Sequence, residues 1–213
     1  MATKIILQRH GESVANTMHI FAGWSDFPLS EKGTLQARVA AEALKNERID
    51  AVYSSDLSRA YSTALPHAEL RGITVEQRPA LREINLGAWE AKTREYLYKN
   101  YPYEAGYIWL EYFGLFRAPE GESAPAAGER FLNELLSIAK ENEGRTVLVA
   151  THAAVIRLCW GRLLGYENHE IGKRLPFSAN ASFSFLTYED GRLIPERYSV
   201  DDHICGIGTE VPK

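Results

Sequence analysis

Cysteine is scarce in this chain of 213 residues, which contains only Cys159 and Cys205. The first falls in a segment with a helical pattern and the second lies near the C-terminus, and this is not the pattern of a disulfide framework. Long apolar runs are also absent: none approaches the roughly 18 residues that a membrane span needs, and the first residues lack the apolar centre of a signal peptide. We therefore expect a protein of the reducing cytoplasm that is neither exported nor anchored.

Neither sign of charge is in large excess. The chain has 24 basic and 28 acidic residues, a net charge of −4 and a pI of about 5.9. This balance excludes a general electrostatic attraction to nucleic acid or to an anionic membrane, so any anion-binding site must be local. A hydrophobic content of 45% is ordinary for a globular protein, and the length is sufficient for a sizeable core.

Short apolar runs with strand character occur at residues 4–8, 51–54 and 146–150. Each is bounded by polar residues, as expected for buried parallel strands. A further short strand is predicted around residues 73–75, and Asp190-Gly191 predicts a hairpin turn that adds an antiparallel pair of strands.

Helical patterns lie between these strands. Ser30 is a candidate N-cap, followed by Leu35, Val39 and Ala43 at four-residue spacing, and we expect this face to pack on the sheet. Similar periods follow the second and third strands. Strands that alternate with helices predict an α/β domain with a mostly parallel central sheet.

Aromatic residues are concentrated in residues 96–116, where 9 of 21 positions are Tyr, Trp or Phe. We interpret the region around 93–127 as a helical, lid-like insertion in a single domain that spans residues 1–213. The aromatic segment could serve as a substrate lid, as core or as the interface of a homodimer. If it covers a site, the ligand is expected to have an apolar or planar part.

Charged and polar residues follow the predicted strands. In open α/β sheets ligands bind beyond the carboxyl ends of the strands. We expect two or three arginines, two histidines and one glutamate to meet there, from the candidates Arg9, His10, Glu12, Arg59, Arg82, Glu83 and His152. Arginine binds phosphate oxygens with two donors, a neutral imidazole can attack phosphorus, and a carboxylic acid can protonate a leaving oxygen. This set indicates phosphoryl transfer through a covalent intermediate.

Four blocks of the sequence carry a resemblance to a known family. They are LQRHGESVAN at 7–16, SSDLSRAYSTA at 54–64, LREINLGAWE at 81–90 and VATHAAVIR at 149–157. Together, and in this order, they resemble the histidine phosphatase superfamily, also called the phosphoglycerate mutase-like family. The resemblance implies a three-layer α/β sandwich.

The resemblance also implies roles for individual residues. His10 would be the nucleophile that becomes phosphorylated, and Glu83 would be the proton donor. The phosphoryl group would be held by Arg9, Arg59, His152 and Asn16. The mechanism requires no metal or cofactor, and the partner would be a small-molecule phosphomonoester.

The sequence departs from the family pattern at three positions. Ala153 and Ala154 follow His152 where many members have two glycines, and Ala91 replaces the glycine of the usual Trp-Glu-Gly. In one branch of the family an aspartate after the second histidine supplies the proton. Ala153 cannot do so, which favours Glu83, with Glu12 as the competing acid.

Hydrolysis and mutase activity both fit the motifs. AGWSDFPLSEKG at 22–33 resembles the cofactor-dependent phosphoglycerate mutases. However, a mutase must hold a bisphosphate, and Lys99 is the only basic residue within 96–116, with Arg94 and Arg117 outside it. Leu86 also stands where the mutases have a tyrosine. We therefore favour a phosphomonoesterase that hydrolyses a small phosphorylated metabolite.

Other classes of function are less well supported. A non-catalytic module that binds a phosphorylated ligand would need neither His10 nor Glu83, and a metal hydrolase would not place arginines beside its histidine ligands. Arg157 and Arg162 are expected on a solvated helix face. The remaining histidines are expected to be structural or exposed; these are His19, His67, His169 and His203.

Overall fold

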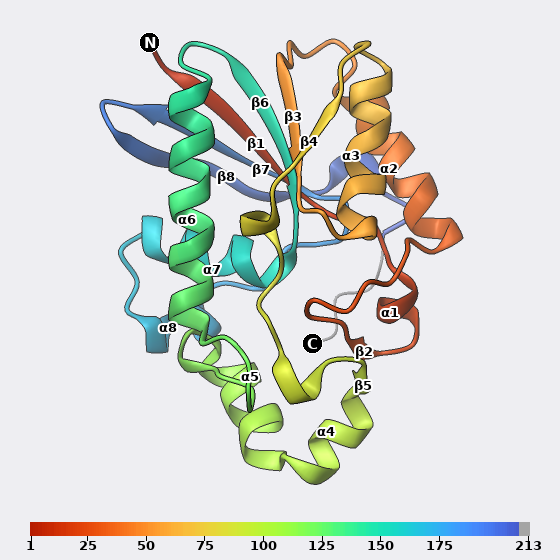
Figure 1. Ribbon diagram of the computed structural model, residues 1–213, viewed down its shortest axis with the longest axis vertical. Coiled ribbons are helices and arrows are strands. Elements are labelled where there is room, and N and C mark those ends of the chain that lie inside the picture. Colours follow the sequence, from red (N-terminus) through yellow and green to blue (C-terminus); the bar gives the residue numbers. More distant parts are fainter. Residues whose placement is uncertain (209–213) are drawn as a thin grey trace.

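The computed structural model describes residues 1–208, apart from the side chains of 106, 107 and 110. Its centre is a six-stranded sheet in the order β4-β3-β6-β1-β7-β8 (Figure 1). Four neighbouring strands are parallel: β1 (Thr3–Arg9), β3 (Ala51–Ser54), β4 (Val75–Gln77) and β6 (Thr146–Thr151). The other two are antiparallel: β7 (Phe183–Glu189) and β8 (Arg192–Val200). This confirms the predicted α/β class with a mostly parallel sheet.

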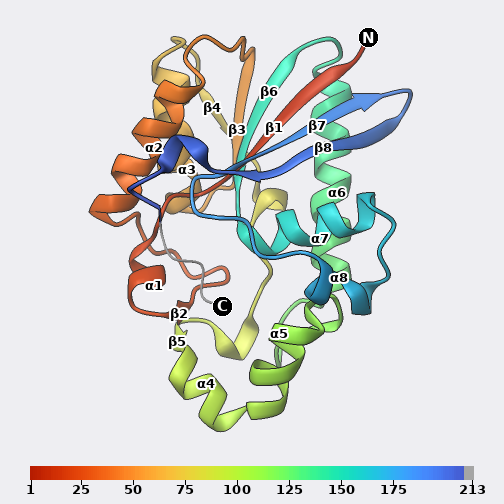
Figure 2. The ribbon, with the colours of Figure 1, turned by 180° about the vertical axis from the view of Figure 1, so that it is seen from behind.

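Helices cover both faces of the sheet, as Figures 1 and 2 show from opposite sides. On one face lie α2 (Glu31–Ala43) and α3 (Ser58–Glu69), and on the other lie α6 (Ala124–Glu141) and α7 (Ala153–Leu163). The apolar residues of the strands are divided between the two layers, with Leu7 in one core cluster and Ile6 in the other. The three-layer sandwich implied by the resemblance is confirmed.

Helix α2 packs on its neighbours through a different face from the one predicted. Leu35 is 48% exposed, whereas Ala37, Ala40 and Ala41 are buried. The buried stripe consists of small residues because α2 approaches the loop after β1 closely: a Cβ on Gly33 would lie 1.9 Å from the Glu12 carbonyl oxygen. The space between the two backbones accommodates alanine and glycine but not a side chain as large as that of Leu35, which the four-residue spacing predicted to be buried.

The predicted hairpin connects β7 and β8 through Asp190 and Gly191. Both residues have positive φ values, 50° and 78°, as two-residue hairpin turns require. The predicted strand around 73–75 is present but begins later, at Val75.

The aromatic-rich segment lies at one end of the molecule, away from the main sheet (Figure 1). It contains α4 (Arg94–Asn100), a π-helical stretch, Pro102–Ile108, and α5 (Trp109–Glu111), followed by a 3-10 turn, Phe113–Leu115. A small second sheet, β2 (Ile20–Phe21) with β5 (Lys92–Thr93), connects this end to the first part of the chain. Five further short helical elements in the described residues are α1 (Val14–Thr17), α8 (Asn168–Arg174) and the 3-10 turns Pro79–Leu81, Gly87–Trp89 and Asp202–Ile204.

The aromatic residues of this segment have different environments. Phe113 and Phe116 are fully buried, whereas Tyr103 is 62% exposed. Trp109 contacts Phe21, Phe113 and Phe116, with ring centroids 4.8–5.0 Å apart. Part of the segment is therefore core.

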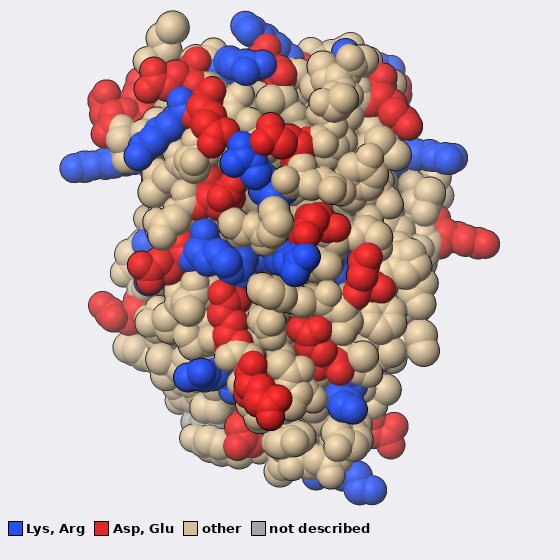
Figure 3. All heavy atoms as spheres, in the orientation of Figure 1, with Lys and Arg blue, Asp and Glu red and all other residues tan. Residues whose placement is uncertain are grey.

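Lys, Arg, Asp and Glu side chains are interspersed over the face drawn in Figure 3. Within residues 1–208, none of the helices has the length and hydropathy needed to cross a membrane. Cys159 is buried in α7 and Cys205 is exposed, and both are free thiols.

Candidate active site

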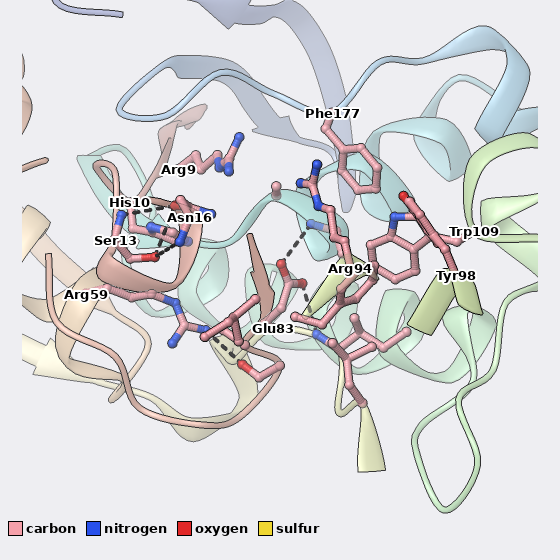
Figure 4. A pocket seen from close by; sticks show the side chains of 18 residues that line it. Arg9, His10, Ser13, Asn16, Arg59, Glu83, Arg94, Tyr98, Trp109 and Phe177 are labelled. Atoms are coloured by element: carbon pink, nitrogen blue, oxygen red, sulfur yellow. Dashed lines mark hydrogen bonds between the residues drawn. The ribbon is translucent and has the colours of Figure 1, made fainter. Parts of the chain in front are cut away.

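A cavity of about 310 Å³ lies beyond the carboxyl end of β1. Its walls come from the end of β1, the first turn of α3, residues 83–86, the start of α7 and the aromatic-rich segment (Figure 4). The sheet thus places the predicted site where parallel strands of an open α/β sheet present their ligand-binding loops.

His10 follows β1 directly and is buried. Its backbone N–H donates to the Thr151 carbonyl oxygen at 2.9 Å, and its ring Nδ1 lies 2.7 Å from the Gly11 carbonyl oxygen. Because a carbonyl oxygen only accepts, Nδ1 carries the proton and Nε2 keeps its lone pair. Burial, with the nearby Arg59 and Arg9, holds the pKa of His10 well below its usual range and keeps the imidazole neutral.

Two arginines are fixed beside His10 by backbone carbonyl groups. Arg59, which is 1% exposed, donates from Nη1 to the Ser25 oxygen at 3.0 Å and from Nη2 to the Gly23 oxygen at 2.8 Å. Arg9 donates from Nη1 to the Ser178 carbonyl oxygen. Burial lowers the pKa of Arg9 to about 10, so its guanidinium group is charged at neutral pH. Burial also lowers the pKa of Arg59, and no carboxylate takes part in the bonds that hold either group.

His152 is the N-cap residue of α7 and is fully buried. In the described part of the chain, neither nitrogen of its ring has a hydrogen-bond partner. Burial first, and then the charge of Arg59, lowers the pKa of His152 far below its usual range. The site therefore contains two neutral imidazoles and two cationic side chains.

Glu83 faces the same cavity, at the N-terminus of α7. One carboxyl oxygen, Oε2, accepts from the Ala154 N–H at 3.1 Å, and Oε1 accepts from the N–H groups of Ile84 at 2.9 Å and Val155 at 3.3 Å. Burial raises the pKa of Glu83, and this effect exceeds the opposing one of the backbone donors. The protonated, proton-donating form is therefore more accessible than in an ordinary glutamate.

The other acid and the third arginine of the predicted set lie elsewhere. Arg82 forms a two-point ion pair with Asp56, at 2.7 and 2.6 Å, so two of the three candidate arginines, Arg9 and Arg59, line the cavity. Glu12 accepts from the Ser30 hydroxyl at 2.8 Å, and the cavity is lined by Glu83 instead.

Asn16 lines the cavity from α1. Its Oδ1 accepts from the Ser13 backbone at 3.0 Å and hydroxyl at 3.1 Å, and from Asn180 Nδ2 at 3.3 Å. All three bonds use the carbonyl oxygen, so the amide Nδ2 is the donor with which Asn16 can reach a ligand.

Sequence reasoning did not place several residues that line the cavity. Phe21, Tyr98, Trp109 and Phe177 supply aromatic surface, and Arg94 supplies a further guanidinium group (Figure 4). The aromatic cluster at 96–116 was a signal for Tyr98 and Trp109, whereas nothing in the local pattern indicated Phe177.

Glu90 was also missed, and it holds the loop that positions Arg59. Its Oε1 accepts from the Trp24 N–H at 2.8 Å and its Oε2 from the Ser25 hydroxyl at 2.9 Å. The following residue, Ala91, has a φ of 59°, the left-handed conformation that glycine adopts most easily. This gives a physical reason for the glycine that resembling sequences have at this position.

Metal ligands do not gather in the part of the chain that the structure describes. Among residues 1–208, no group of three or more His, Cys, Asp or Glu side chains could hold a metal ion.

Comparison with known proteins shows the family of this chain. Residues 5–201 match the histidine phosphatase superfamily (branch 1), and the chain belongs to this family. Phosphoserine phosphatase 1 of Hydrogenobacter thermophilus is 32% identical over 211 residues, which are 99% of this chain and 98% of that protein. A probable phosphoglycerate mutase of Yersinia pestis, GpmB, is 32% identical over 189 residues, covering 88% of this chain and 86% of the relative.

A solved structure shares the whole fold. Bacillus stearothermophilus YhfR superposes with a TM-score of 0.89 at 29% identity, over 95% of this chain and 99% of its own. The family and these relatives support phosphoryl transfer of the phosphatase or mutase type.

Proposed function

We propose that this protein is a phosphomonoesterase that hydrolyses a small phosphorylated metabolite through a phosphohistidine intermediate. The observation that carries the proposal is the state of His10: a buried, neutral imidazole whose Nδ1 is held by the Gly11 carbonyl group, beside the guanidinium groups of Arg9 and Arg59. A nucleophile needs this free lone pair, and a phosphoryl group needs these cations.

In the first step, Nε2 of His10 attacks phosphorus. A P–N bond forms, the bond from phosphorus to the leaving oxygen breaks, and Glu83 gives its proton to that oxygen. Arg9, Arg59, His152 and Asn16 hold the oxygens of the transferred group, with the cations balancing their charge.

In the second step, water attacks the phosphohistidine and Glu83, now a carboxylate, accepts a proton from it. The P–N bond breaks, inorganic phosphate leaves and neutral His10 is restored. One carboxyl group thus serves as acid and then as base, and its raised pKa suits the first role.

The residues that line the cavity support hydrolysis of a monophosphate over mutase activity. Leu86 contributes an apolar wall, and Arg94 is the one basic residue among the lining residues outside the proposed phosphate-binding set. A bisphosphate would need a second cluster of cations. Mutase-type transfer stays the alternative because a relative of similar identity is named a probable phosphoglycerate mutase.

The aromatic surface favours a leaving group with an apolar or planar part. Trp109 and Phe177 line the cavity opposite the proposed phosphate site, with Tyr98 and Arg94 on the same side (Figure 4). Phe21 is a further aromatic lining residue. Rings of this kind bind planar groups by stacking.

The test is phosphate release from p-nitrophenyl phosphate in the presence of a chelator. We expect turnover in the wild type, a loss of at least about 10³-fold in His10→Ala, and no change in the matched control His169→Ala, whose side chain is exposed. Activity that survives in His10→Ala would overturn the proposal. A strict mutase would release little phosphate but interconvert phosphoglycerates when primed with a bisphosphate.

A further inference from the structure

Arg157 is buried within the protein, although the sequence predicted a solvated helix face for it. It is 4% exposed and lies one turn of α7 after Ala153, which lines the cavity. Its Nε donates to the Leu175 carbonyl oxygen at 2.6 Å and its Nη2 to the Gly172 oxygen at 2.7 Å. These carbonyl groups belong to the last turn and the C-cap of α8, where a cation offsets the helix dipole.

The same guanidinium group packs against the aromatic rings behind the cavity. Its central carbon lies 4.2 Å from the ring centroid of Phe177 and 5.1 Å from that of Phe113. Phe177 in turn stacks on Trp109, with centroids 5.7 Å apart and planes inclined by 23°. Phe177 and Trp109 line the cavity (Figure 4), whereas Arg157 is not among the lining residues and contacts this aromatic wall through Phe177.

Helix α8 and the aromatic-rich segment pack backbone to backbone. A Cβ on Gly172 would lie 2.6 Å from the Glu111 carbonyl oxygen, and a Cβ on Gly114 would lie 2.1 Å from the Asn168 oxygen. Contacts this close allow little independent movement. By binding α8, Arg157 therefore also fixes the segment that carries Trp109.

Carbonyl groups and ring faces, instead of a carboxylate, stabilise the charge of Arg157. None of the ion pairs in the described part of the chain includes it. Burial lowers its pKa to about 10, so it is charged at neutral pH. Burying a cation costs free energy unless it is hydrogen-bonded. The two bonds to carbonyl groups of α8 therefore hold the planar guanidinium group of Arg157 in one orientation.

We propose that Arg157 is the positioning residue of the aromatic wall, and that by fixing Phe177 and Trp109 relative to the phosphate site it sets selectivity for phosphomonoesters with a planar leaving group. This inference rests on the proposed function. It separates two roles of α7: its first turn contacts Glu83, and the next turn holds the surface that binds the leaving group.

The experiment compares Arg157→Lys and Arg157→Met with a control on the same helix, Arg162→Met, whose side chain is partly exposed. For each variant, kcat and KM are measured with phenyl phosphate and with glycerol 3-phosphate, together with the inhibition constant of inorganic phosphate. Lysine keeps the charge but loses the planar fork.

We expect KM for phenyl phosphate to rise about tenfold in both Arg157 variants, a loss the size of one aromatic contact. The values for glycerol 3-phosphate and inorganic phosphate should stay within about twofold, and Arg162→Met should behave as wild type. An equal loss for all substrates would instead show a general structural role, and an unchanged KM ratio would also overturn the proposal.

Phe177→Leu covers the case in which the Arg157 variants do not fold, because it removes the ring but keeps the buried cation in place. The proposal requires the same selective rise in KM in this variant. If the wild type hydrolyses neither ester, the proposed function fails. The wall is then tested separately by calorimetry, in which Phe177→Leu must weaken phenyl phosphate binding more than inorganic phosphate binding.

Discussion

The rings of His10 and His152 meet edge to face, with centroids 5.2 Å apart and planes inclined by 61°. Two imidazoles this close would repel each other if both were protonated. Burial and the neighbouring arginines lower the pKa of both, so we expect the pair to be neutral at neutral pH.

Glu83→Gln removes the candidate acid and keeps the shape of the side chain. We expect kcat/KM for an alkyl phosphate to fall about 10²- to 10⁴-fold, the usual contribution of general acid catalysis. The loss should be much smaller for p-nitrophenyl phosphate, whose leaving group needs no proton. Equal losses for the two esters would exclude Glu83 as the acid.

The pH profile gives an independent check on the same residue. The raised pKa of Glu83 means that its proton is present below that pKa and lost as the pH rises through it. The rate with an alkyl phosphate should therefore decline toward alkaline pH, on a limb whose midpoint lies above the usual glutamate pKa of 4.5. Glu83→Gln should abolish this limb, and a limb that persists in the variant would belong to another group.

Arg59→Lys keeps one positive charge but cannot reach two carbonyl groups with a planar fork. The charge is no longer fixed by the Gly23 and Ser25 oxygens, so we expect kcat/KM to fall by about 10²-fold or more. Thermal unfolding shows whether the fold is kept. Arg38→Lys, an exposed change on α2, is the control, and wild-type kinetics in Arg59→Lys would contradict the assignment.

His67 makes stability depend on pH. It is fully buried, and burial lowers its pKa from 6.5 to about 3. Between these values the unfolded chain binds a proton that the folded chain does not, so stability is present above pH 6.5 and lost as the pH falls toward 3. This residue alone should reduce the free energy of unfolding by about 2 kcal/mol between neutral pH and pH 5.

Urea unfolding at pH 7 and pH 5 tests this for the wild type and His67→Leu. We expect the free energy of unfolding to change less between pH 7 and pH 5 in His67→Leu than in the wild type, by about 2 kcal/mol. His169→Leu, on the surface, should leave the difference unchanged. An identical pH dependence in wild type and His67→Leu would refute the prediction.

Ala91→Gly should stabilise the protein. Alanine in a left-handed conformation costs about 1–2 kcal/mol, and glycine loses about 0.5–1 kcal/mol of backbone freedom, so we expect a net gain of about 0.5–1 kcal/mol. Ala88→Gly in the neighbouring 3-10 turn, where φ is not positive, should destabilise by a similar amount. Denaturant unfolding of both variants measures the two effects, and a loss of stability in Ala91→Gly would contradict the argument.

Residues that directly follow a strand could be predicted from the sequence, because the end of a parallel strand has a known place in the fold. His10 after β1, Arg59 in the first turn of α3 and His152 after β6 all belong to this group. Their neighbourhood follows from strand order: His10 and Arg59 line one cavity, and the buried ring of His152 packs against that of His10.

Residues placed by packing between distant segments could not be predicted in this way. Phe177 reaches the cavity from a loop before β7, and Arg94 reaches it from α4. Arg157 shows the limit most clearly, since a charged residue on a helix is normally solvated, and its burial is explained by the carbonyl groups of α8 and the rings of the aromatic wall. The four-residue spacing predicted that the face of α2 with Leu35 would be buried, but it could not indicate how closely the backbone of α2 approaches the loop after β1.

Carbonyl oxygens, which carry no net charge, hold both arginines of the proposed phosphate site, so no ion pair in these bonds neutralises them. In a protein whose net charge is −4, we expect these two cations to make the potential inside the cavity locally positive. Phosphate dianions that diffuse past the surface would be drawn toward it before any contact forms. The rate of substrate capture should therefore fall as ionic strength rises, although the protein as a whole repels anions.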